Sequence, residues 1–118
     1  GYRFERGRKW PRDKSLMKLK DALRAKTKRT NGNSLESIIG DVNRTLRGWV
    51  EYFKHSYRTT FPSLDGWIRR RLRSILRKRS KRRGISRGLD HQRWPNAYFR
   101  ERGLFSLEEA HRSLLQSR

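Results

Sequence analysis

Nine apolar residues between positions 35 and 57 fall on one side of a single predicted helix, and this pattern constrains the fold more than any other in the chain. The stripe consists of Leu35, Ile38, Ile39, Val42, Leu46, Trp49, Val50, Phe53 and Tyr57. At 100° per residue, these side chains lie within about 120° of arc. Ser34 stands directly before them, in the position that caps a helix. A helix with so broad an apolar side needs other helices to cover it, so we expect an all-α domain around helix 34–57.

Two further helices are predicted, one before and one after this element. Over residues 13–30, Leu16, Leu19 and Leu23 recur at helical spacing, with Asp13 and Ser15 as candidate caps. Over residues 63–82, Ser63 is the predicted cap, and the apolar stripe is Leu64, Trp67, Ile68, Leu72, Ile75 and Leu76. The predicted fold class is therefore all-α, a small three-helix core with a short helical C-terminal extension.

Domain boundaries follow from these patterns. Residues 1–12 read as an extended tail, and residues 13–89 form the predicted helical domain. Residues 90–118 are expected to be a loosely packed extension, in which Trp94-Pro95 opens a short helix and Ser106-Leu-Glu-Glu109 is a capping-box pattern that opens the last one.

Positive charge dominates the chain, which carries 32 Lys and Arg against 11 Asp and Glu, a net charge of +21. Hydrophobic residues make up only 32%, against about 45–50% in typical globular domains. Eleven of the cations lie between Trp67 and Leu89, where there is no acid. A solvated basic surface is the alternative interpretation, but a wall rich in arginine suits bidentate phosphate contacts. We expect a polyanion partner, with nucleic acid as the leading candidate.

The candidate nucleic-acid-binding residues lie mainly on helix 63–82 and just after it. Arg69, Arg70, Arg73, Arg77 and Lys81 are predicted to point away from the apolar stripe, while Arg71 flanks the stripe. Lys14 and Lys18 of the first helix are predicted to extend the surface. The complete predicted set is Arg69, Arg70, Arg73, Arg77, Lys78, Lys81, Arg82, Arg83, Lys14 and Lys18.

Catalysis by this chain alone is not expected. It has no cysteine, no apolar stretch of transmembrane length, no glycine-rich phosphate loop and no serine nucleophile motif. Its aspartates are isolated in sequence, and so are His55 and His91. Glu108, Glu109 and His111 share one short predicted helix, which reads as a surface helix. We therefore expect no catalytic residue, no metal site and no cofactor.

The aromatic residues divide into two predicted groups. Trp49, Phe53 and Trp67 lie on apolar stripes and are expected to pack in the core. Trp10, Tyr52, Trp94 and Tyr98 lie off the strongest stripes, so they are candidates for stacking on unpaired bases.

Three sequence blocks resemble a known family. They are Gly1-Tyr-Arg-Phe4, then Ser34-Leu-Glu-Ser-Ile-Ile39 followed by Leu46-Arg-Gly-Trp-Val-Glu-Tyr-Phe53, and finally Phe61-Pro-Ser-Leu-Asp-Gly-Trp-Ile-Arg-Arg-Arg-Leu-Arg73. The first resembles the segment that closes the palm of group II intron reverse transcriptases, and the other two resemble their maturase-specific region. The family commonly has Asn-Pro where this chain has Asn43-Arg44, so the chain lacks the proline that would break the helix there.

The resemblance implies a helical thumb and domain X, which follow a polymerase core and bind intron RNA. The Tyr-x-Asp-Asp polymerase motif is absent from this chain, so the resemblance implies partners rather than catalysis. The implied partners are structured intron RNA and the reverse-transcriptase core of a longer parent chain, with DNA as a further candidate. A bacterial cytoplasmic or nucleoid-associated location is expected.

Four functions remain open from the sequence. The leading hypothesis is an RNA-binding maturase module that assists intron folding and splicing by holding backbone phosphates. The alternatives are a thumb that grips a template–primer duplex and an independent basic helical DNA-binding protein. Binding to an anionic membrane is the weakest, because the apolar stripes are expected to pack in a core and no membrane partner is predicted.

Overall fold

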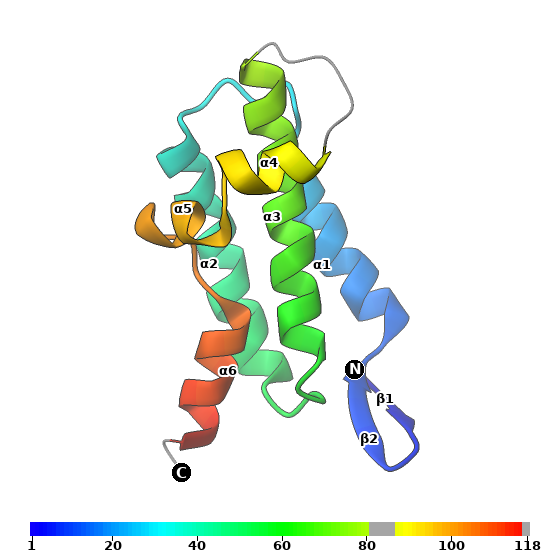
Figure 1. Ribbon diagram of the computed structural model, residues 1–118. Coiled ribbons are helices and arrows are strands. Elements are labelled where there is room, and N and C mark those ends of the chain that lie inside the picture. The colour runs from blue at the N-terminus through cyan, green and yellow to red at the C-terminus, as the bar shows by residue number, and fades with distance from the viewer. Residues whose placement is uncertain (81–86, 117–118) are drawn as a thin grey trace.

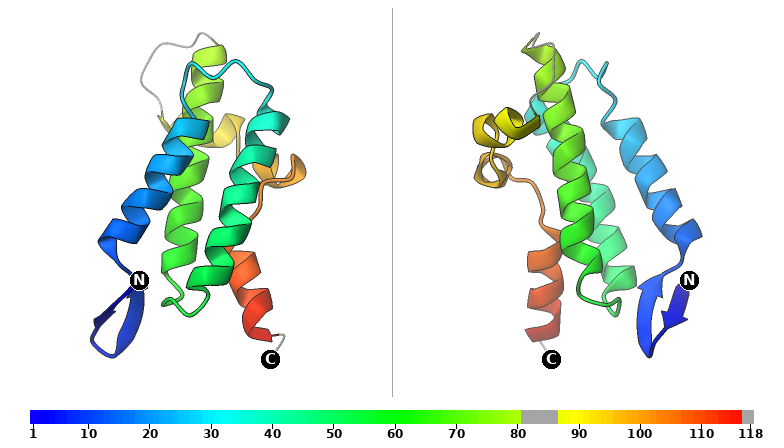
Figure 2. Two further views of the ribbon diagram at one scale, coloured as in Figure 1. Left: turned by 180° about the vertical axis from the view of Figure 1, so that it is seen from behind. Right: turned by 45° about the vertical axis from the view of Figure 1, so that its right-hand side comes forward.

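Three long helices form the body of the protein, as predicted (Figures 1 and 2). The computed structural model describes residues 1–80 and 87–116. Helix α1 spans Asp13–Lys26, α2 spans Leu35–Phe53 and α3 spans Thr60–Arg79. The fold is mostly helical, which confirms the predicted class.

Helix α2 supplies the largest share of the core. Seven of its nine predicted stripe residues are buried, and Trp49 and Tyr57 are half-buried. The amide of Ser37 donates to Ser34 Oγ at 3.1 Å, which confirms the predicted cap. The helix runs without a break through Asn43-Arg44. Leu19 and Leu23 of α1 and Leu72 and Ile75 of α3 complete the core around it.

One predicted helix start and the predicted caps of two helices are wrong. Helix α3 begins at Thr60, three residues before the predicted cap Ser63, so Pro62 lies inside its first turn. Proline is tolerated there because its missing N–H would have no partner within the helix. Helix α1 begins at Asp13 as predicted, but the capping position is Arg12, which makes no side-chain cap, and not Asp13 or Ser15. The hydroxyl of Ser15 faces the carbonyl oxygen of Gly1 at 3.5 Å instead of capping the helix.

The N-terminal segment is a β-hairpin and not the predicted extended tail. Strand β1 (Tyr2–Glu5) pairs antiparallel with β2 (Arg8–Pro11). Arg6 and Gly7 link them with positive φ values of 52° and 74°, as a tight two-residue hairpin turn requires. The amide of Tyr57 donates to the Lys9 carbonyl at 2.8 Å, which holds the hairpin against the end of the α2 region.

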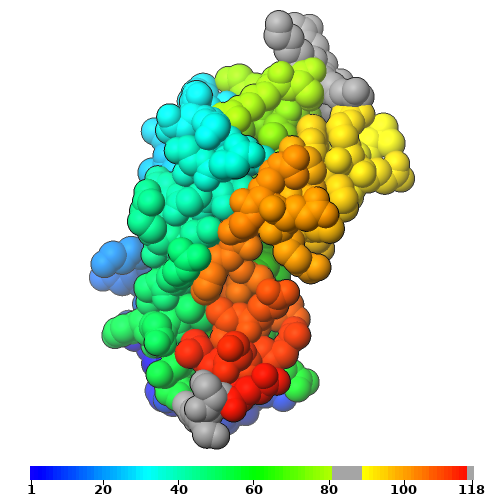
Figure 3. All heavy atoms as spheres, turned by 90° about the vertical axis from the view of Figure 1, so that its left-hand side faces the viewer, coloured from blue at the N-terminus to red at the C-terminus, as the bar shows by residue number. Residues whose placement is uncertain are grey.

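The C-terminal segment packs tightly, contrary to expectation. It contains α4 (Arg87–Arg93), α5 (Asn96–Glu101) and α6 (Leu107–Gln116), which run down one side of the molecule against α2 and α3 (Figure 3). Phe99 and Leu107 are fully buried in the common core. Polar side chains of the long helices hold the segment in place, because Asn43 Nδ2 donates to the Gly103 carbonyl at 2.8 Å and Asn43 Oδ1 accepts from the Phe105 amide at 2.8 Å.

Helix α6 is capped by a residue from another helix as well as by its own. The Leu107 and Glu108 amides donate to the Asp65 carboxylate at 2.9 and 3.0 Å. Ser106 Oγ donates to the same carboxylate at 3.1 Å and accepts from the Glu109 amide at 3.2 Å, which confirms Ser106 as the predicted cap. Burial raises the pKa of Asp65, although these hydrogen bonds oppose that shift.

Candidate nucleic-acid interface

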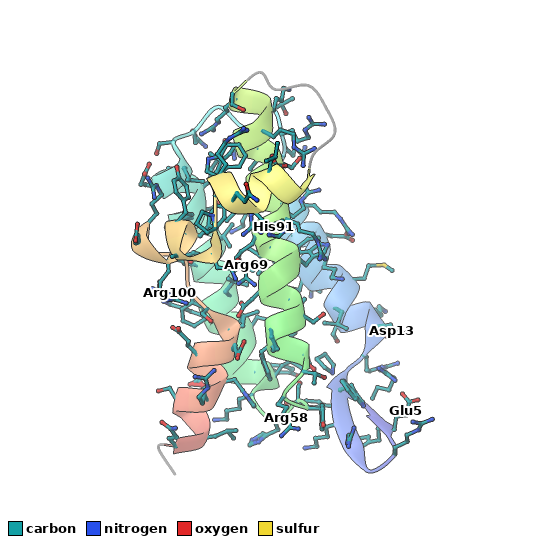
Figure 4. All side chains as sticks on the ribbon, viewed as in Figure 1. Glu5, Asp13, Arg58, Arg69, His91 and Arg100 are labelled. Atoms are coloured by element: carbon teal, nitrogen blue, oxygen red, sulfur yellow. The ribbon has the colours of Figure 1, made fainter. Side chains whose placement is uncertain are left out.

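The arginines of α3 divide between two sides of the helix. Arg69, Arg73 and Arg77 recur every four residues and face the C-terminal segment. Figure 1 shows α4 and α5 lying across α3, and Figure 4 labels Arg69 on that side. Arg70 and Lys78 are exposed. The prediction of one outward arginine wall is therefore wrong for part of the set, because α4 and α5 cover that side of α3.

Arg73 is the clearest correction. Its side chain is 3% exposed. Its Nε donates to the Trp94 carbonyl at 2.8 Å and its Nη2 donates to Asn96 Oδ1 at 2.9 Å, while the guanidinium lies 5.3 Å from the centre of the Phe99 ring. Burial lowers the pKa of Arg73, with the nearby Arg69 charge acting in the same direction. This guanidinium holds α5 in place and has no free donor face toward a ligand.

Arg77 is also committed inside the protein. It forms an ion pair of 2.7 Å with Asp90 of α4, whose side chain is almost fully buried. Because the pair neutralises both groups, Arg77 is not part of an open cationic surface. Asp90 lies 13 residues after Arg77 in the sequence, so local helical spacing does not predict this ion pair.

Arg69 lies between these extremes. It is half-buried and lines a hollow of about 320 Å³ shared with Arg100 and Arg112 (Figure 4). The same hollow is lined by Asp65, Glu108 and Glu109, so its cations are balanced by carboxylates. This balance makes it a poor phosphate site.

A different group of cations gathers around Trp67 on the side of α3 that faces α1. Lys20 Nζ and the Arg24 guanidinium, both from α1, lie 5.3 and 5.4 Å from the centre of the Trp67 ring. The Arg71 guanidinium lies 5.8 Å from the same ring. We call the surface made by Lys20, Arg24, Trp67, Arg70, Arg71 and Lys78 the α1–α3 cationic face. Its α3 members lie within about 100° of arc; Arg70 and Lys78 are exposed, while Trp67 and Arg71 are half-buried.

Arg71 sets the geometry of this face by tying α1 to α3. Its Nε donates to Thr27 Oγ1 at 3.1 Å, and its Nη2 donates to the Thr27 carbonyl at 3.3 Å. Burial lowers the pKa of Arg71, and the neighbouring Arg24 charge lowers it further. Two like charges are thus held close together, with Asp21 as the carboxylate partner of Arg24 at 2.8 Å. An anion placed here would relieve that repulsion.

The face continues toward the hairpin. A hollow of about 350 Å³ lies between the hairpin, α1 and the start of α3, with Arg3 and Lys20 among its lining residues. Trp10 also lines it, half-buried and packed at 5.0 Å between ring centres on Tyr57. No carboxylate is among the described residues that line this hollow.

Lys20 and Arg24 were missed by sequence reasoning, although a signal was present. They are four residues apart and flank the apolar positions of α1, where a cation borders the neighbouring helix. The predicted Lys14 and Lys18 are exposed, but Lys18 lines a hollow between α1 and α2 and does not join the α3 cations. The predicted Lys81, Arg82 and Arg83 lie outside the described residues.

The aromatic residues that were predicted to stack on unpaired bases differ in how exposed they are. Trp94 is 8% exposed and belongs to the core, so its predicted availability is wrong. Tyr98 is half-buried, with the Arg102 guanidinium 3.4 Å from its ring centre. Tyr52 remains 66% exposed. Trp49, Phe53 and Trp67 pack in or against the core, as predicted.

Helix α6 differs from the predicted surface helix because His111 is buried. Its ring stacks on Phe61 with 4.1 Å between centres and 17° between planes. Burial lowers the pKa of His111, although the Lys54 backbone opposes that shift. In residues 1–80 and 87–116, no three His, Asp or Glu side chains converge in a way that could hold a metal ion. Over the same ranges, no helix combines the length and hydropathy needed to cross a bilayer.

Comparison with known protein families gives a match. A model of the group II intron maturase-specific domain matches residues 16–95, which include most of α1 and all of α2, α3 and α4. No curated protein matches the chain. Because the match covers more than half of the sequence, the chain belongs to the group II intron maturase-specific domain family.

Proposed function

We propose that this chain is an RNA-binding module that helps a group II intron RNA to fold and splice, and that the α1–α3 cationic face is its main contact surface. The observation that carries the proposal is the convergence of Lys20, Arg24 and Arg71 on one tryptophan ring. Arg70 and Lys78 extend the same surface along α3.

The physical role of this face is charge neutralisation. Phosphate contacts release counterions from RNA, and each contact therefore adds salt-dependent affinity. Such contacts position the RNA but do not read its sequence. Because the major groove of A-form RNA is too narrow for a helix, selectivity for the intron would come from RNA shape and unpaired bases. The protein supplies no chemical step in this mechanism.

A second candidate is a thumb that grips a template–primer duplex beside a polymerase core in a longer chain. The length of the α1–α3 cationic face favours this candidate, because a duplex needs an extended contact surface. Helix α3 alone is about 30 Å long, and the molecule is elongated, with extents of 46 × 28 × 25 Å. This candidate requires activity to appear only together with a reverse-transcriptase core. Binding to DNA by this chain alone is the remaining alternative.

A competition assay tests the proposal. The chain is bound to labelled intron RNA at physiological salt and challenged with unlabelled intron RNA, unrelated structured RNA or duplex DNA. The face variant carries Lys20→Gln, Arg70→Gln and Lys78→Gln. The matched control carries Arg44→Gln, Arg47→Gln and Arg100→Gln, which removes three exposed cations from α2 and α5.

We expect the intron RNA to be the best competitor, and we expect the face variant to lose affinity while the control keeps it. Equal loss in both variants, with no preference among the competitors, would reduce the protein to a generic polycation and contradict the proposal. A preference for duplex DNA would favour the DNA-binding alternative.

A further inference from the structure

A hollow of about 480 Å³ opens between α1 and α2, on the side of α1 away from the α1–α3 cationic face. Both helices face the viewer in the left-hand view of Figure 2. Small residues, Ala22 of α1 and Gly48 of α2, line the hollow, and so do three aromatic residues, Trp49, Tyr52 and Phe53. The α1–α3 cationic face does not use this site.

Gly48 is difficult to explain by folding alone. A glycine inside a helix costs about 0.5–1 kcal/mol relative to alanine. Gly48 has no left-handed φ, and nothing lies within 4 Å of the place where its Cβ would stand. Neither backbone conformation nor close packing therefore requires glycine here. Its effect is to leave the hollow open.

The aromatic wall of the hollow is fixed in position. The Tyr52 ring meets Phe53 edge to face, with 4.7 Å between ring centres. Phe53 in turn stacks on Trp49 at 4.8 Å. Tyr52 is nevertheless 66% exposed. An exposed ring held by its neighbours offers a flat surface for stacking at little cost in side-chain entropy.

The charges around the hollow indicate the class of occupant. Lys18 is among its lining residues, and no carboxylate is among the described ones. A planar apolar group attached to an anion fits this combination. We propose that the hollow takes one unpaired nucleobase of the bound RNA, stacked against Tyr52, with Lys18 beside its phosphate. This inference rests on the proposed function and adds the recognition of an unpaired base to it.

The test compares two RNA stems that differ only in one unpaired nucleotide. We expect the wild-type chain to bind the bulged stem about tenfold more tightly than the fully paired stem, equivalent to about 1.4 kcal/mol. Base–aromatic stacking has this order of magnitude. The Gly48→Met variant places a long side chain inside the hollow and obstructs it, so we expect it to bind both stems equally, with the affinity for the paired stem unchanged.

Gly40→Met is the matched control. Gly40 lies on the same helix and also has nothing within 4 Å of its added Cβ, but it does not line the hollow. The control should keep the preference for the bulged stem, and a Tyr52→Ala variant should lose most of it. Urea unfolding of each variant shows whether it is folded under the binding conditions.

Three results would overturn the inference in distinguishable ways. Equal binding of both stems by the wild-type chain would overturn it and leave the proposed function intact. If Gly48→Met kept the preference for the bulged stem, this hollow would be excluded as the base site. A side chain of a partner protein would then be the remaining candidate occupant. Failure to bind either stem would overturn the proposed function itself.

Discussion

Replacing Arg73 should destabilise the fold, while replacing its neighbour Arg70 should not. Arg73 is buried and donates two hydrogen bonds, to the Trp94 carbonyl and to Asn96 Oδ1. Arg70 lies three residues earlier on the same helix, about 60° of arc away, and is exposed. The pair Arg73→Leu and Arg70→Leu therefore makes the same chemical change in two environments.

The expected magnitude follows from the contacts that are lost. Each hydrogen bond from a charged donor contributes about 1.5–3 kcal/mol, and a buried carbonyl left without a donor costs about 1–3 kcal/mol. Burying leucine recovers part of this loss through its apolar surface. We expect Arg73→Leu to lower the free energy of unfolding by ~3 kcal/mol, whereas exposed substitutions stay within about 0.5 kcal/mol.

Urea unfolding followed by circular dichroism measures the difference. With a denaturant slope of about 2 kcal/mol/M, a loss of ~3 kcal/mol moves the midpoint down by about 1.5 M. Arg70→Leu should keep its midpoint and lose RNA affinity instead. If Arg73→Leu unfolded at the same urea concentration as Arg70→Leu, the assignment of Arg73 to the interior would be refuted.

Three further outcomes are expected. Asp65→Ala should lower the free energy of unfolding by about 1–3 kcal/mol, because the amides at the start of α6 lose their acceptor. Calorimetry at neutral pH measures this loss of stability, and an unchanged melting temperature would contradict the capping role of Asp65. The lowered pKa of His111 means that its contribution to stability is present above its unfolded pKa of about 6.5 and is lost as the pH falls through its folded pKa. The melting temperature should therefore fall between pH 7.5 and 5, and fall less in His111→Phe; an equal fall in both proteins would place the titration elsewhere. Gly40→Ala should raise the free energy of unfolding by about 0.5–1 kcal/mol, because nothing obstructs the added methyl group. Urea unfolding measures this change, and a lower urea midpoint than that of the wild type would contradict the prediction.

The helical core could be predicted from the sequence because local patterns determine it. The apolar stripe of residues 35–57 and the Ser34 cap gave α2 correctly, since both depend only on residues close together in the chain. The hairpin was missed because its turn has Arg6 in a left-handed conformation, which arginine rarely adopts.

The errors at the site arise from contacts between distant residues. Helical spacing places Arg73 off the apolar stripe, but it does not reveal that the Trp94 and Asn96 region will cover that side of α3. Asp65 is isolated in sequence, yet its carboxylate caps a helix that begins 42 residues later. Such arrangements depend on tertiary packing, for which the sequence pattern carries no local sign.

The salt dependence of intron RNA binding tests the central claim most directly. Each phosphate contact contributes about 0.7–0.9 to the slope of log affinity against log salt concentration. Removing Lys20, Arg70 and Lys78 together should therefore reduce the magnitude of the slope by about 2–3. The matched control, which lacks Arg44, Arg47 and Arg100, should keep the wild-type slope. Equal reductions in the two variants would contradict the assignment of RNA contact to the α1–α3 cationic face.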